Sequence, residues 1–175
     1  MNVAVVGYSG DIDKSPVKEL AEKVLELGRR LAKEGHVILN GGRDGVMELV
    51  SKAVKEAGGT VIGVLPAFEY GNDYLTFRVK TPFDNVTRSI VLIESSDVVV
   101  SVGGEVGTAI EILLAYAKFK PVILFVGTGG WTDRFASVLI EGKYLDNRKN
   151  VEVRIARDVQ EVIDIINEIG RMKNE

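Results

Sequence analysis

The strongest constraint on the fold is a short apolar segment that leads directly into three glycines. Residues Asp97 to Val102 read Asp-Val-Val-Val-Ser-Val, a run typical of a strand that is buried on both faces of a parallel sheet. Gly103, Gly104 and Gly107 then provide a turn, and Ala109 to Lys118 has a wide apolar helical face. A helix that leaves such a turn points free backbone amides and its positive dipole end at one place. The pattern predicts an anion site, most often for phosphate; a turn without any ligand is the alternative.

The same alternation of strand, turn and helix continues through the chain. Periodicity predicts strands over residues 2–7, 36–40, 60–65, 77–80, 97–102, 121–126 and 151–155, and helices over 16–34, 46–57, 84–94, 109–118, 132–140 and 159–172. Ser15 is predicted to cap the first helix and Pro16 to be its first residue. This order predicts an α/β fold, namely a Rossmann-like doubly wound parallel sheet with helices on both faces. The length fits one domain, residues 1–175.

Composition excludes several classes of site. The chain has no cysteine, so it offers no disulfide, thiolate nucleophile or cysteine-ligated zinc. Its net charge is -3, with 22 basic and 25 acidic residues interspersed, which argues against a nucleic-acid partner. No apolar run approaches the ~20 residues of a membrane span, and the first strand leaves no room for a signal segment. We therefore expect a cytoplasmic protein with no membrane partner.

Three glycine turns are predicted to meet at one crevice. They are residues 7–10, 41–45 and 103–107, and each follows a strand. Ligands of doubly wound sheets bind at the carboxyl ends of the strands, where the strand order reverses. The turns do not match a dinucleotide fingerprint, because the first lacks G-x-G-x-x-G and the second strand ends in Asn40 rather than an acidic residue. A Gly-Lys-Ser/Thr phosphate loop is also missing, so the fold alone does not imply NAD or ATP.

The residues of these turns carry a family resemblance. The stretches are Asn40-Gly-Gly-Arg-Asp-Gly-Val-Met47, Arg88 and Gly103-Gly-Glu-Val-Gly-Thr-Ala-Ile-Glu111. From about residue 2 to 126 the chain resembles the Lonely Guy (LOG) family of nucleoside 5′-monophosphate phosphoribohydrolases, long labelled "lysine decarboxylase". That family has a G-G-x-x-G-x-M turn, an arginine and a P-G-G-x-G-T-x-x-E signature. The spacing from Arg88 to Glu111 fits its catalytic pair. No lysine has the setting of a pyridoxal Schiff base, so decarboxylation is not expected.

An equally close resemblance is to the molybdenum cofactor carrier proteins of the same superfamily. Their Gly-Val-Leu-Pro after the third strand occurs here as residues 63–66. The chain also differs from the LOG pattern. The Arg-Lys pair reads Arg88-Ser89, the proline before the double glycine is Val102, and the first of two glutamates is Ile110, while Glu105 places a charge inside the turn. Two functions stay open: hydrolysis of a nucleoside monophosphate, and non-catalytic binding of a nucleotide or molybdenum cofactor.

The resemblance implies a role for each site residue. Glu111 would stabilise the oxocarbenium-like state of N-glycosidic cleavage, which releases the base and ribose 5-phosphate, and Arg88 would balance its charge and contact the phosphate or the base. The alternative is that these two form a structural ion pair. The phosphate would be held by residues of the three turns: Gly7, Ser9, Gly41, Gly42, Arg43, Gly103, Gly104, Gly107 and Thr108. No metal is required, and no cofactor is predicted for the hydrolysis.

Other residues have less specific roles. Resemblance implies a homo-oligomer, with the apolar helix up to Phe119, including Tyr116, as its contact. His36 is the only histidine and opens a strand, so it is predicted to be a boundary residue rather than a catalyst. Trp131 either stacks on a bound base or seals the edge of the core or a dimer contact.

Overall fold

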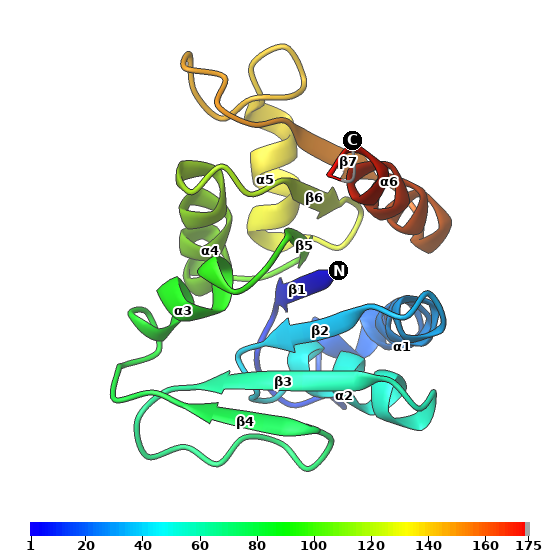
Figure 1. Ribbon diagram of the computed structural model, residues 1–175. Coiled ribbons are helices and arrows are strands. Elements are labelled where there is room, and N and C mark those ends of the chain that lie inside the picture. The colour runs from blue at the N-terminus through cyan, green and yellow to red at the C-terminus, as the bar shows by residue number, and fades with distance from the viewer. Residues whose placement is uncertain (174–175) are drawn as a thin grey trace.

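The computed structural model describes residues 1–173 and contains one parallel sheet of seven strands (Figure 1). The strands are β1 (Asn2–Gly7), β2 (Val37–Asn40), β3 (Thr60–Leu65), β4 (Phe77–Lys80), β5 (Val98–Val102), β6 (Val122–Phe125) and β7 (Val153–Ala156). Their order is β4-β3-β2-β1-β5-β6-β7, and every neighbouring pair is parallel. The predicted doubly wound α/β fold is confirmed.

Six helices within the described residues cover the two faces of this sheet (Figure 1). One face carries α1 (Val17–Lys33), α2 (Val46–Glu56) and α6 (Val159–Met172); the other carries α3 (Arg88–Glu94), α4 (Val106–Ala117) and α5 (Gly130–Val138). Alternate residues of the strands supply the two cores, because successive side chains of a strand point to opposite faces. In β1, Val3 and Val5 join the first core, while Ala4 and Val6 join the second.

The strand order places the ligand crevice of such a sheet next to β1. The chain runs from β1 outward to β4, and then returns to pair β5 with the free side of β1. The loops that follow β1 and β5 therefore leave the sheet in opposite directions, which opens a crevice between them. Within residues 1–173, no helix is long and apolar enough to cross a membrane.

Four helix starts differ from the sequence prediction, and one of them is that of α5, which begins at Gly130 rather than at residue 132. Helix α1 begins at Val17, and Pro16 rather than Ser15 takes the N-cap position without a side-chain cap. Helix α3 begins at Arg88 instead of residue 84, because the Asp84 carboxylate accepts hydrogen bonds from the amides of Val86 and Thr87 and forms a turn there. Helix α4 begins at Val106, so its first turn contains a glycine that the prediction assigned to the loop.

Candidate functional site

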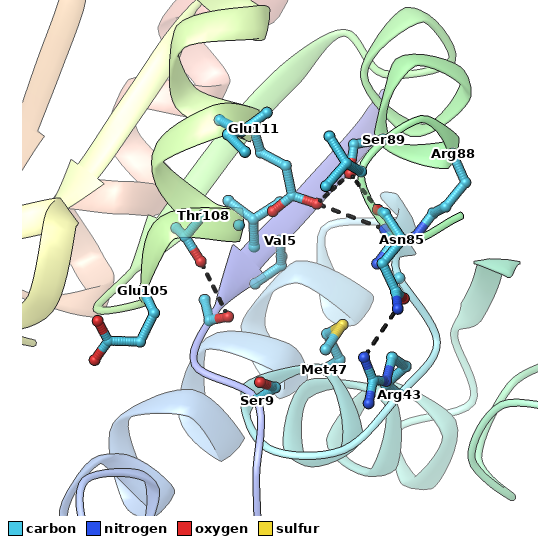
Figure 2. Close-up of a pocket in the computed structure, with 16 residues that line it drawn as sticks. Val5, Ser9, Arg43, Met47, Asn85, Arg88, Ser89, Glu105, Thr108 and Glu111 are labelled. Carbon is cyan, nitrogen blue, oxygen red and sulfur yellow. Dashed lines mark hydrogen bonds and ion pairs between the residues drawn. The ribbon is translucent and has the colours of Figure 1, made fainter. Parts of the chain in front are cut away.

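A pocket of about 140 Å³ lies in the crevice between β1, β2 and β5 (Figure 2). Its lining comes from all three glycine turns and from helices α3 and α4. Eight of the predicted site residues line it: Gly7, Ser9, Gly41, Arg43, Arg88, Gly107, Thr108 and Glu111. The other three, Gly42, Gly103 and Gly104, lie in the same turns but outside the pocket lining. The fold thus brings together residues that are up to 104 positions apart, Gly7 and Glu111 being the extremes.

The two predicted catalytic residues face each other across the pocket (Figure 2). Arg88, the first residue of α3, and Glu111, in the second turn of α4, are 5% and 8% exposed. Arg88 Nη1 lies 3.5 Å from Glu111 Oε1, and the Ser89 hydroxyl donates a hydrogen bond of 3.0 Å to the same oxygen. Burial raises the pKa of Glu111, although Arg88 and Ser89 both act to lower it.

Arg88 has more hydrogen-bond donors than its surroundings satisfy. Its Nε and Nη1 atoms are buried and have no hydrogen-bond acceptor among the described residues. Burial lowers the pKa of this guanidinium, Glu111 opposes that effect, and nearby Arg43 adds to it. The guanidinium also lies against Gly41, where any Cβ atom would overlap it. Because a buried donor without an acceptor is costly, this arrangement favours a ligand that brings oxygen or nitrogen acceptors into the pocket.

The glycines of the third turn have different roles. A Cβ atom on Gly103 would overlap the ring of Tyr8, and one on Gly104 would overlap Thr108, so both glycines permit close packing. A Cβ atom on Gly107 would meet nothing within 4 Å, and this residue borders the open pocket. The Thr108 hydroxyl donates to the Gly7 carbonyl at 3.1 Å, which ties the start of α4 to the end of β1.

The second turn is held by a buried amide side chain. Asn40 Oδ1 accepts a hydrogen bond of 2.8 Å from the amide of Gly42, while its Nδ2 donates to Ser51 and to the carbonyl of Met47. These bonds fix the path of the chain past Gly41 and so leave the space that Arg88 fills. A Cβ atom on Gly42 would overlap Leu65, which makes this glycine a packing residue as well.

Two charged residues lie at the rim of the pocket. Arg43 is partly exposed, with its Nε 3.4 Å from Glu69 Oε2 and its Nη1 3.4 Å from Asn85 Oδ1. Glu105 is exposed, and in Figure 2 its carboxylate points away from Glu111 and Arg88. The charge that the sequence places inside the turn is therefore directed away from the centre of the pocket.

Several lining residues were not predicted. Sequence reasoning noted Ser89 only as a departure from the family pattern and Met47 only as part of the second turn's motif, and it missed Asn85 and Val86. Asn85 and Val86 were assigned to a helix, although they belong to the turn before α3. An Asp at position 84 that caps two amides is the signal that would have placed them in a loop.

Two other candidates lie outside the pocket lining. His36 precedes β2 at the opposite end of the sheet, and its Nδ1 lies 3.4 Å from the Met1 amino nitrogen. Burial lowers the pKa of His36, which keeps the ring neutral near pH 7. Trp131 packs against Phe135, with ring centroids 5.4 Å apart, and belongs to the edge of the core rather than to the pocket. Residues 1–173 contain no cluster of three or more His, Cys, Asp or Glu side chains that could hold a metal ion.

Comparison with known proteins identifies the family of this chain. The model of the SLOG cluster4 family matches residues 1–163. The chain belongs to the SLOG cluster4 family. The structure of TM1055 is similar to the chain at 63% identity, with a TM-score of 0.94 over 95% of this chain and 98% of that one. The molybdenum cofactor binding protein of Rippkaea orientalis is 32% identical with a TM-score of 0.78, and the molybdenum cofactor carrier protein of Chlamydomonas reinhardtii is 33% identical with a TM-score of 0.76. Each comparison covers 96% of both chains.

Proposed function

We propose that this SLOG cluster4 protein binds a phosphorylated pterin-type cofactor, such as molybdenum cofactor, and carries it without chemical turnover. The observation that carries the proposal is the similarity to two molybdenum cofactor proteins at 32% and 33% identity over 96% of each chain. The cysteine-free composition fits a cytoplasmic location for such a carrier.

The pocket supports a ligand with two kinds of polar group. Gly107 and Thr108, in the first turn of α4, line the pocket, and the free backbone amides of a first helical turn suit a phosphate. The buried Nε and Nη1 atoms of Arg88 need acceptors, which a phosphate or the oxygen and nitrogen atoms of a heterocycle supply. A pterin carries both acceptor types, and its phosphorylated side chain would lie along the α4 turn.

Glu111 favours binding over hydrolysis. In a phosphoribohydrolase this carboxylate must contact the ribose or a water molecule. Here its Oε1 already accepts the Ser89 hydroxyl and pairs with Arg88, and the side chain is 8% exposed. The residue that precedes it, which is a second glutamate in the LOG pattern, is Ile110. The carboxylate that pairs with Arg88 is therefore already engaged, and Glu105 at the rim points away from it.

Hydrolysis of a nucleoside monophosphate is the second candidate. It is favoured by one observation: an arginine and a glutamate with a burial-raised pKa occupy the same pocket as the phosphate-type turn. A carboxylate of that kind is common in catalytic sites, but structural ion pairs produce the same shift.

A screen with two readouts separates the candidates. The purified protein is incubated with AMP, with an N6-substituted AMP and, anaerobically, with molybdenum cofactor; free base is measured by chromatography and the melting temperature by calorimetry. We expect molybdenum cofactor to raise the melting temperature through mass action and no nucleotide to release base. Base release that Glu111→Gln abolishes would instead establish the hydrolase. If no compound raises the melting temperature and none is cleaved, both functions are wrong.

A further inference from the structure

The strand pairing of the sheet ends one residue before the third glycine turn. Val102, the last residue of β5, is aligned with Gly7 of β1 and with Phe125 of β6. Gly103 follows it and is buried, so its backbone amide and carbonyl need hydrogen-bond partners from outside the strand ladder. The dihedral φ is +60° at Gly103 and +94° at Gly104, and glycine has the most flexible backbone of all residues. This turn therefore needs support from other segments to keep one conformation.

Two threonines of the β6–α5 connection provide the missing partners. The Thr128 hydroxyl accepts a hydrogen bond of 2.8 Å from the Gly103 amide, and the Thr132 hydroxyl donates one of 2.7 Å to the Gly103 carbonyl. Because a hydroxyl has one proton, the bond between Ser101 and Thr132 is donated by Ser101. Thr128 donates its own proton to the carbonyl of Phe125. All three hydroxyl side chains belong to residues that are at most 4% exposed, so buried hydroxyls hold Gly103 on both sides.

The connection that carries both threonines fits closely on the turn. The amide of Trp131 donates a hydrogen bond of 2.9 Å to the Gly104 carbonyl, and a Cβ atom on Gly130 would overlap the backbone of Gly104. Asp133 anchors the connection, since each of its carboxylate oxygens accepts a hydrogen bond of 2.9 Å from an amide within it. Residues 127–133 are thus fixed themselves and hold the turn at a second residue.

We propose that Thr128 and Thr132 are positioning residues of the anion site, although neither lines the pocket. Through Gly103 they fix the direction in which the chain enters α4, and so the place of the free amides of its first turn, at Gly107 and Thr108. A turn that already has its binding conformation loses less backbone entropy when a ligand arrives, so its affinity is higher. The proposal rests on the proposed function only in taking the ligand to be a phosphate held at this helix start.

The test measures the affinity of the folded protein for inorganic phosphate. Phosphate is titrated at constant ionic strength and well below the melting temperature, while two-dimensional proton–nitrogen NMR follows the amides of Gly107 and Thr108. Thr132→Val keeps the shape of the side chain but removes its hydroxyl, and we expect the dissociation constant of phosphate to rise about tenfold, the order of one hydrogen bond. Thr128→Val leaves the Gly103 amide without its acceptor and should act in the same direction, so either variant decides if the other does not fold. Thr132→Ser keeps the hydroxyl and should bind phosphate within about twofold of the wild type.

Ser96→Ala is the matched control. The Ser96 hydroxyl is also buried and donates to a backbone carbonyl, that of Ile93 at 2.8 Å, but it lies before β5, at the opposite end of this strand from the turn. Its loss should lower the melting temperature and leave the phosphate affinity unchanged. A merely structural role for Thr132 would give that same result. Equal affinities of the wild type and Thr132→Val, or a serine variant that binds no better than the valine variant, overturn the proposal.

The outcomes also separate this proposal from the proposed function. If phosphate shifts the amides of Gly107 and Thr108 equally well in the wild type and in both valine variants, the positioning role is wrong, and the carrier function is still decided by the ligand screen. If phosphate does not shift these amides in the wild type, the anion site is wrong and this proposal with it. If molybdenum cofactor does not bind while phosphate affinity depends on Thr132, the carrier function alone is wrong.

Discussion

Arg88 and Glu111 are two ionisable side chains that the fold buries beside the pocket. Both are almost fully buried, their closest approach is 3.5 Å, and two donors of Arg88 have no acceptor among the described residues. A buried pair of this kind adds little to stability, because the loss of hydration offsets the attraction. The presence of this pair at the pocket is therefore better explained by ligand binding than by a contribution to stability.

Removing one partner of the pair should lower the free energy of unfolding. Arg88→Met leaves the Glu111 carboxylate buried with Ser89 as its main partner, and we expect the free energy of unfolding to fall by about 3 kcal/mol. Adding Glu111→Gln removes that charge and keeps an acceptor for Ser89, so the double variant should recover at least about half of the loss. Urea denaturation of the wild type, both single variants and the double variant measures the coupling. Additive losses would show that the two side chains do not interact.

The raised pKa of Glu111 predicts how stability changes with pH. Above the ordinary carboxyl pKa the unfolded chain releases this proton while the folded protein still holds it, so the contribution of Glu111 to stability falls as the pH rises, until the raised pKa is passed. Glu111→Gln does not titrate. The difference in unfolding free energy between the wild type and this variant should thus shift against the wild type from about pH 4 to pH 8. A difference that is constant across this range would mean that the pKa is ordinary.

Helix α4 provides a variant that separates stability from ligand binding. Gly107 is in the first helical turn and lines the pocket, and a methyl group there would meet no atom within 4 Å. Gly107→Ala should therefore raise the free energy of unfolding by about 0.5–1 kcal/mol, because alanine is the better helix residue. It should also reduce the melting-temperature increase caused by the ligand found in the screen. If that increase is unchanged, the phosphate does not lie at this turn.

Gly28→Ala in α1 is the contrasting variant. Its methyl group would lie 2.8 Å from the Cβ of Ala53, where α1 packs on α2. We expect this overpacking to lower the free energy of unfolding by roughly 1–3 kcal/mol and to leave the ligand-induced increase intact. The same calorimetric scans measure both variants.

The elements that sequence reasoning placed well are those with strong local signals. All seven predicted strands are present, and α6 has its predicted bounds, because apolar periodicity and glycine turns mark them. The errors lie at helix starts. The Asp84 carboxylate bonds to two backbone amides and replaces the first turn of the predicted α3, whereas at α1 Pro16 rather than Ser15 takes the N-cap position and no side chain caps the helix. Such bonds depend on local geometry that residue types alone do not specify.

The site was partly predictable for the same reason. The three turns converge because the carboxyl ends of parallel strands meet at one edge of the sheet, and the sequence indicates both the strands and the turns. It does not indicate which glycines border open space. Gly103 and Gly104 pack against Tyr8 and Thr108, whereas Gly107 faces the pocket, and only the tertiary structure distinguishes these cases.

Helix α4, which the family resemblance makes the contact of a homo-oligomer, leaves Leu113 48% exposed, so we expect stability to depend on protein concentration. If two copies dissociate as they unfold, a tenfold increase in concentration adds about 1.4 kcal/mol per dimer, or about 0.7 kcal/mol per chain. For a chain of this length that should raise the melting temperature by roughly 1–3 °C. Calorimetry of the wild type and of Met172→Asp, a control at an exposed residue of α6, should show this increase across a hundredfold range of concentration. Leu113→Asp, which places a charge on the exposed side of α4, should melt at one temperature throughout. An increase that persists in Leu113→Asp would place the contact elsewhere on the molecule.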